Sequence, residues 1–374
     1  MSWRSGCAAR GAKHLSDRAM KNRTAKKVSV HEQIAKRIKG VRLTRRVHDM
    51  AQEKERGLFA LLSQSLVIAQ DKVKDRGEDS YLIGFRENAG VCAVFDGLGG
   101  SGSRQYKEYG DKTGAYIASR AVSEEMYNWF LAFSEDQNGL SSPKIAKSLH
   151  ERIDKRLSAC QDSETKKSSL KSSMTRDFPT TLSMLVFRPD GQGGISANVI
   201  WAGDSRCYWL DGGGLHQLTL DDTHQQDAYE ALYKDAAMNN VISASEPYSL
   251  SEYILDGLSR GIAFSATDGC FGYLQSPMHF EYLVLDSMLR AESISEMEKS
   301  LHERLTQIAG DDFTLTGAVF GFENFKQMKE YYRKRYDVLF PKYIEHFRES
   351  SREQRLDLWN EYRSGYEKYL PAKK

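Results

Sequence analysis

Acidic residues stand at the ends of four apolar stretches of this 374-residue chain. In chain order they are Glu78 and Asp79 before SYLIGF, Asp96 after VCAVF, Asp268 after GIAFSAT, and Asp311 and Asp312 before FTLTGAVF. Carboxylates removed from water repel one another, so several of them at one end of a sheet need a cation to neutralise them. Ligands that are all oxygen select hard ions such as Mg²⁺ or Mn²⁺. The pattern therefore predicts a site for divalent cations at the ends of buried strands.

Two alternatives compete with this interpretation. An Asp-Gly pair after a strand is more often a turn than a ligand, because Asp bonds its own backbone there, so each motif alone is weak and only the set of four is informative. The glycines at positions 97, 99 and 102 also satisfy G-x-G-x-x-G, a dinucleotide-binding pattern. Asp96 directly before the first glycine would place a negative charge beside the pyrophosphate, which disfavours the nucleotide hypothesis.

Apolar stretches separated by turn-forming clusters predict the elements that position these carboxylates. Strands are expected at 65–69, 80–85, 91–95, 181–187, 195–201, 206–210, 261–267 and 313–320, and helices at 105–130, 143–159 and twice within 276–308. The short connections PDGQGG and GDS favour antiparallel hairpins over crossovers. The order of strands, helices, strands, helices and a last strand predicts an α+β fold.

Charge divides the chain into three parts. Residues 1–56 hold 16 Lys or Arg against 5 Asp or Glu, residues 57–320 hold 24 against 37, and residues 321–374 hold 13 against 9. We therefore predict a basic N-terminal extension, an acidic catalytic domain and a helical, aromatic-rich C-terminal extension with these boundaries. The basic arm could attract nucleic acid or an acidic membrane, although a solvated arm is the preferred interpretation.

The C-terminal extension carries an aromatic stripe. Its members recur at spacings of three and four residues, which places them on one helix face: Leu356, Trp359, Tyr362, Tyr366 and Tyr369. Such a face either packs on the body of the protein or binds a partner, and packing is the favoured alternative.

Cysteine usage and hydropathy indicate the compartment. The five cysteines are an odd number and contain no C-x-x-C pair, which is typical of reduced thiols. No stretch approaches the roughly 18 apolar residues of a membrane span, and the first twenty residues have no apolar core of a secretory signal. A cytoplasmic protein without a membrane span is expected.

Six ordered motifs resemble the metal-dependent protein phosphatase 2C family over about residues 64–320. They are EDS at 78–80, VFDGLGG at 94–100, PTTLSMLVF at 179–187, WAGDSRCYWLDGGGLHQLTLDD at 201–222, SATDG at 265–269 and GDDFTLT at 310–316, of which GDSR with its surroundings is the most specific. The resemblance implies an αββα sandwich of two antiparallel sheets flanked by helices. It also implies hydrolysis of phosphoserine and phosphothreonine in proteins by a water that two Mn²⁺ or Mg²⁺ ions activate, in opposition to a protein kinase.

By motif position the resemblance also implies residue roles. Asp96 would bridge two metals and Gly97 would lend its carbonyl, Glu78 would serve one metal, Asp268 and Asp311 would serve the other, and Asp79 would orient water. Lys74, with Arg76 nearby, stands where the family has a phosphate-binding arginine, Asp177 is a candidate ligand for a third metal, and Asp204 is expected to be structural.

Four positions depart from the family pattern. Lys replaces Arg at Lys74, Leu98 stands where eukaryotic members have a histidine, Pro179 replaces a glycine and Asp312 replaces an asparagine. No core ligand is lost. The departures keep open the alternative of an inactive pseudophosphatase that acts as a binding or regulatory module.

Overall fold

The computed structural model describes residues 41–43, 57–135, 145–162, 175–225, 227–234 and 237–371. One compact unit spans Gly40–Lys374. Most of the predicted basic arm lies outside the described residues. Its described part, β1 (Val41–Leu43), is a strand that was not predicted, and it pairs in parallel with β3 (Ser80–Phe85).

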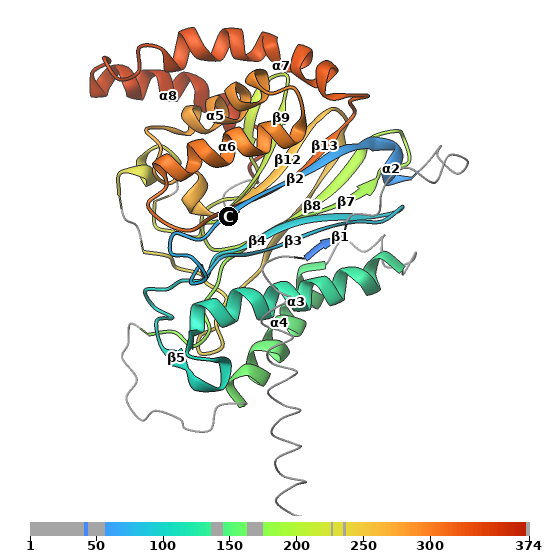
Figure 1. Ribbon diagram of the computed structural model, residues 1–374, viewed down its shortest axis with the longest axis vertical. Helices are drawn as coiled ribbons and strands as arrows, with labels where there is room; N and C mark the ends of the chain where they lie inside the picture. Colours follow the sequence, from blue (N-terminus) through green and yellow to red (C-terminus); the bar gives the residue numbers. More distant parts are fainter. Residues whose placement is uncertain are drawn as a thin grey trace, which may run out of the picture. The chain divides into compact units, whose positions relative to one another are not determined.

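Two sheets form the centre of this unit (Figure 1). The first sheet has the order β1, β3 (Ser80–Phe85), β4 (Gly90–Phe95), β7 (Leu182–Pro189), β8 (Ile195–Ala202) and β11 (Ser251–Leu258). The second has the order β10 (Gly214–Gln217), β9 (Arg206–Asp211), β12 (Gly261–Ala266), β13 (Phe313–Phe320) and β2 (Leu62–Gln70). Every strand pair except β1 with β3 is antiparallel, so the predicted α+β class is confirmed.

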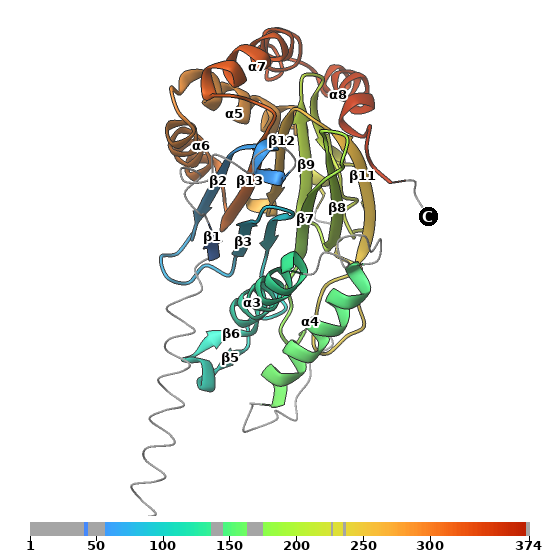
Figure 2. The ribbon, with the colours of Figure 1, turned by 90° about the vertical axis from the view of Figure 1, so that its right-hand side faces the viewer.

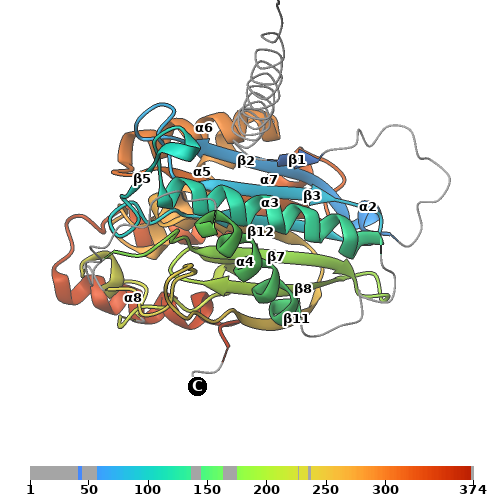
Figure 3. The same cartoon turned by 90° about the horizontal axis from the view of Figure 1, so that it is seen from below.

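Helices cover both outer faces of the paired sheets. Figures 2 and 3 show α3 (Gly114–Glu135) and α4 (Ile145–Asp162) on the first sheet, with α5 (Pro277–Arg290) and α6 (Ile294–Ile308) on the second. A short α2 (Leu58–Leu61) precedes β2. Between the sheets, apolar side chains from both inner faces meet, as where the rings of Phe187 and Phe320 lie 5.0 Å apart. This is the αββα sandwich that the sequence resemblance implied.

The structure corrects the predicted elements in two places. The helix expected from residue 105 begins at Gly114, because a small hairpin of β5 (Gln105–Tyr106) and β6 (Lys112–Thr113) precedes it, turning at Gly110 with φ +70°. Strands β10 and β11 were not predicted. Strand β11 lies at a sheet edge and leaves much of its surface in solvent, so it lacks the apolar run on which the prediction depended.

The C-terminal residues form α7 (Phe325–Leu339), a π-helical turn (Phe340–Ile344) and α8 (Arg352–Tyr366). Trp359, Tyr362 and Tyr366 are 1%, 5% and 2% exposed and share an apolar cluster with Phe280 of α5. The prediction that the aromatic stripe packs on the body is therefore confirmed. The domain boundaries at residues 56 and 320 remain predictions, and no helix among the described residues is long and apolar enough to cross a membrane.

Candidate active site

The acidic motifs lie at the same ends of paired strands. Ser80 pairs with Phe95, so Asp79 and Asp96 extend past one end of β3 and β4. In the second sheet Ala266 pairs with Leu315, which brings the residues after β12 beside those before β13. The two sheets are joined at this end by the Thr267 hydroxyl, which donates a hydrogen bond to Asp79 Oδ2 at 2.8 Å.

Electrostatic interactions connect these carboxylates into one group, the carboxylate cluster, which comprises Glu78, Asp79, Asp96, Asp204, Asp268 and Asp311. Burial, with repulsion from neighbouring carboxylates, raises the pKa of Asp79 to about 8 and that of Asp204 to about 8. The same causes raise the pKa of Asp96 well above its usual value, with Asp79, Asp268 and Asp204 as the repelling carboxylates. The cluster therefore holds protons where isolated aspartates would be ionised.

The donor set fits a hard divalent cation. All the side-chain donors are carboxylate oxygens, and a cation near Asp96 and Asp268 would relieve the repulsion between them. In the described part of the chain, no group of three or more His, Cys, Asp or Glu side chains has the arrangement needed to hold a metal ion as it stands.

Glycines allow the backbone segments of the cluster to approach. A β-carbon on Gly99 would lie 2.1 Å from Glu78 Oε2, and one on Gly269 would lie 1.9 Å from the carbonyl oxygen of Asp312. A β-carbon on Gly97 would lie 2.6 Å from the carbonyl oxygen of Ala115, at the start of α3. Gly97 and Gly269 need glycine because a β-carbon there would meet backbone atoms, whereas at Gly99 the Glu78 side chain would have to turn away.

Gly97→Ala is expected to lower the free energy of unfolding by about 1–3 kcal/mol, because the added methyl group meets backbone atoms that cannot rotate away. Gly100→Ala is the matched control, since a β-carbon there has no heavy atom within 4 Å. Urea unfolding of both variants measures the difference. Equal midpoints would contradict the close approach of Gly97 to α3.

Arg120 is a buried cation beneath Glu78 that the sequence did not indicate. Its guanidinium donates to the carbonyl oxygens of Gly77 at 2.9 Å and of Glu78 at 3.3 Å, and it lies 3.5 Å from the centre of the Tyr116 ring. The Ser119 hydroxyl also donates to the Glu78 carbonyl, at 2.5 Å. Helix α3 thus holds the backbone of the first acidic motif from below, and only the packing of α3 on the sheet could reveal this.

Asp312, where the family pattern has asparagine, binds two backbone amides. Its Oδ1 accepts from Lys72 N and its Oδ2 from Glu78 N, each at 2.7 Å. An asparagine has one side-chain acceptor oxygen and could satisfy only one of these amides. The extra negative charge therefore holds the turn before β3 against β13.

Lys74 and Arg76, the predicted phosphate-binding candidates, lie on this same turn with exposed side chains. The turn is tight, since Arg76 N donates to the Val73 carbonyl at 2.9 Å and Asp75 has a φ of +64°. The cation that acts electrostatically on Glu78 is Arg120. The structure thus places Lys74 and Arg76 beside the first acidic motif and leaves their part in phosphate binding a proposal.

Asp177, the candidate for a third metal, contacts α4 and Ser245. Its Oδ2 accepts from Gln161 Nε2 of α4 at 3.4 Å, and its backbone amide donates to Ser245 Oγ at 3.0 Å.

The glycine pattern at 97–102 lacks the helix that a dinucleotide site needs, because α3 begins only at Gly114.

Tyr273 is a second residue that the sequence analysis missed. Its side chain is 49% exposed, and its ring packs so closely on Gly310 that a β-carbon there would lie 2.4 Å from it. Partial burial and then the charges of Asp311, Asp268 and Asp96 raise the pKa of its phenol. An exposed aromatic side chain therefore borders the carboxylate cluster.

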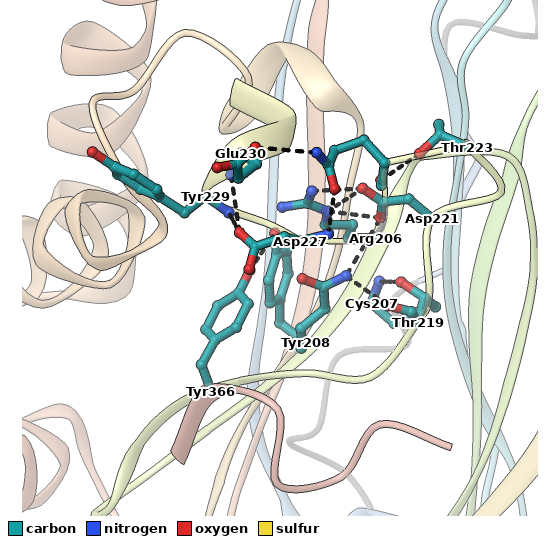
Figure 4. Close-up of polar contacts among 12 residues, drawn as sticks. Arg206, Cys207, Tyr208, Thr219, Asp221, Thr223, Asp227, Tyr229, Glu230 and Tyr366 are labelled. Carbon is teal, nitrogen blue, oxygen red and sulfur yellow. Dashed lines mark hydrogen bonds and ion pairs between the residues drawn. The ribbon is translucent and has the colours of Figure 1, made fainter. Parts of the chain in front are cut away.

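Arg206 of the GDSR motif points toward Asp221 (Figure 4). Its guanidinium binds Asp221 through Nε at 2.9 Å and NH2 at 2.6 Å, and stacks on Phe271 at 4.3 Å from the ring centre. Its charge lowers the pKa of Asp268, against the larger effect of burial. Asp204, expected to be structural, lies within the cluster itself.

Without divalent metal, the protein is expected to lose stability as the pH rises from 6.5 to 8. Asp79 and Asp204 have folded-state pKa values of about 8 against an ordinary aspartate value of 3.8, so the folded state holds more protons and the free energy of unfolding falls with pH. Below pH 6.5 His279, whose pKa burial lowers to about 4, acts in the opposite sense.

Thermal unfolding in EDTA at several pH values measures this effect, and Asp79→Asn should flatten the dependence. A melting temperature in EDTA that rises between pH 6.5 and 8 would contradict the raised pKa values. Added Mn²⁺ should restore stability at pH 8, because it replaces the protons.

Comparisons with known proteins agree with the fold. The family model described as protein phosphatase 2C matches residues 69–306. Stp1, a serine/threonine phosphatase from Staphylococcus aureus, is 15% identical with a TM-score of 0.52, covering 72% of this chain and 98% of its own. A bacterial serine phosphatase is 15% identical with a TM-score of 0.52, covering 69% and 98%. The catalytic domain of the phosphatase PstP with two manganese ions is 15% identical with a TM-score of 0.45, covering 70% of this chain and 100% of its own.

No curated protein matches this chain. The match of the family model over more than half of its length shows that this chain belongs to the protein phosphatase 2C family.

Proposed function

We propose that this protein hydrolyses phosphoserine and phosphothreonine esters in proteins with the aid of two Mn²⁺ or Mg²⁺ ions. The observation that carries the proposal is the convergence of carboxylates from both sheets: Thr267 donates a hydrogen bond to Asp79, and the charge of Asp268 acts on Asp96. Because the chain belongs to the protein phosphatase 2C family, we interpret the converging carboxylates as ligands of catalytic metal ions.

The proposed ligands come from the four acidic motifs. The ions would be held by the side chains of Glu78, Asp96, Asp268 and Asp311, together with the carbonyl oxygen of Gly97. When bound, such ions supply positive charge that activates water at neutral pH and neutralises phosphoryl oxygens.

Other residues orient the reactants. Asp79, which accepts a hydrogen bond from the Thr267 hydroxyl, would orient the attacking water. Lys74 or Arg76 would attract the phosphate from the exposed turn, and Lys74 does so as a point charge without a bidentate grip. Leu98 cannot donate a proton, so the leaving alkoxide would take its proton from water.

The test is hydrolysis of a phosphothreonine peptide and of p-nitrophenyl phosphate by the purified chain with Mn²⁺, with EDTA as the control. Isothermal titration with Mn²⁺ separates the alternatives. Tight metal binding with turnover supports the phosphatase, whereas absence of both supports the pseudophosphatase.

The wider setting is also proposed. Substrates would be phosphoproteins made by a protein kinase, and the four described cysteines, all free and buried, support a cytoplasmic location. A third ion at Asp177 and polyanion binding by the basic arm remain the less favoured parts of this proposal.

A further inference from the structure

One loop begins and ends beside the carboxylate cluster. This loop runs from Thr223 to Met238, with residues 223–225, 227–234, 237 and 238 described, and a bridge between Thr223 and Met238 closes its base. The preceding residue, Asp222, accepts a hydrogen bond from Gly203 N at 3.0 Å, directly before Asp204. A few residues after the loop, Ile242 pairs with Thr180, which also pairs with Gly97. The base of the 223–238 loop is therefore attached to two motifs of the site.

The middle of the 223–238 loop is held by α8. Asp227 Oδ2 accepts from Arg363 NH1 at 2.8 Å and from Trp359 Nε1 at 3.2 Å. Asp227 Oδ1 accepts from the backbone amides of Tyr229 and Glu230, each at 3.0 Å (Figure 4). One carboxylate thus joins the loop backbone to the C-terminal helix, and the Tyr229 ring stacks on Trp359 with centres 6.2 Å apart.

Two further contacts tie this assembly to the site. The Tyr233 hydroxyl donates to the Gln275 carbonyl at 2.7 Å, close behind the 3-10 turn Asp268–Cys270. The Tyr366 hydroxyl of α8 lies 3.5 Å from that of Tyr208, two residues after Arg206 (Figure 4). Helix α8 therefore contacts both the loop and the strand that carries Arg206.

We propose that α8 positions the 223–238 loop at the rim of the carboxylate cluster and so determines the affinity for phosphorylated polypeptides. The proposal rests on the proposed phosphatase function. A polypeptide has to lie across the rim, and a loop that is already ordered loses less conformational entropy when it is contacted. A small phosphate ester needs only the cluster, so its hydrolysis should not depend on α8. Asp227, Trp359 and Arg363 are positioning residues in this scheme.

The discriminating variant is Arg363→Met, which removes the ion pair with Asp227. Arg363 also pairs with Glu367 at 2.8 Å, so Glu367→Gln is the matched control that leaves Asp227 untouched. Arg363→Lys retains a cation for Asp227 and should restore much of the effect. The measurements are hydrogen exchange of residues 223–238, and kcat and KM for a phosphothreonine peptide and for p-nitrophenyl phosphate.

We expect Arg363→Met to speed exchange in the 223–238 loop roughly ten-fold and to raise the peptide KM several-fold, because a charge-assisted hydrogen bond is lost. Its kcat values and its KM for p-nitrophenyl phosphate should stay within about two-fold of the wild type. Unchanged exchange, or equal changes with both substrates, would overturn the proposal. If the wild type hydrolyses neither substrate, the proposed function fails, and the peptide's binding affinity for wild type and Arg363→Met decides this inference instead.

Discussion

Arg335→Met is expected to lower the free energy of unfolding by about 3–5 kcal/mol, because it leaves a buried carboxylate without its cation. Glu281 of α5 is fully buried. Its carboxylate accepts from Arg335 Nε at 2.6 Å, from Arg335 NH2 at 2.8 Å and from the Tyr362 hydroxyl at 2.6 Å. Both partners belong to the C-terminal extension, so this extension neutralises a charge inside the αββα sandwich.

Urea unfolding measures this loss. Arg333→Met is the control, since Arg333 is exposed on the same helix. The double variant Glu281→Met with Arg335→Met should recover most of the stability, because no charge is then left buried. If Arg335→Met unfolds at the same urea concentration as Arg333→Met, the ion pair between Arg335 and Glu281 does not stabilise the fold.

Asp96→Asn is expected to reduce phosphatase activity by more than about a hundred-fold while stabilising the metal-free protein. The loss follows from the proposed role of Asp96 between the two ions. The gain in stability follows from burial and from repulsion by Asp79, Asp268 and Asp204, which raise the pKa of Asp96 and make its ionised form unfavourable in the fold. An amide of nearly equal volume removes that charge.

Two measurements test the expected loss of activity and the expected gain in stability. Activity with Mn²⁺ and urea unfolding in EDTA at pH 8 are compared for Asp96→Asn and for Asp337→Asn, an exposed aspartate of α7. Wild-type activity in Asp96→Asn would exclude it as an essential ligand. A lower stability in EDTA would show instead that the Asp96 carboxylate is favourable in the metal-free fold.

The sequence alone predicted the strands that position the cluster, because these strands are buried and their apolar runs end sharply at polar turns. Strand β13 was predicted with its observed bounds. The acidic residues at its start, and those after β4 and β12, could be located because they adjoin these apolar runs in the sequence. The edge strand β11 was missed because half of its surface faces solvent. The start of α3 was misplaced because a glycine-rich loop and a hairpin stand where a helical pattern was read.

The amino-acid order thus determined which carboxylates stand at strand ends, since a strand's limits depend on neighbouring residues. Only the tertiary structure decided what surrounds them. Arg120 supports Glu78 from a helix 42 residues away, and Arg363 reaches Asp227 across 136 residues. Hydrogen bonds and ion pairs of such separation depend on how helices pack on sheets, and the pairing of single polar side chains leaves no periodic pattern in the chain.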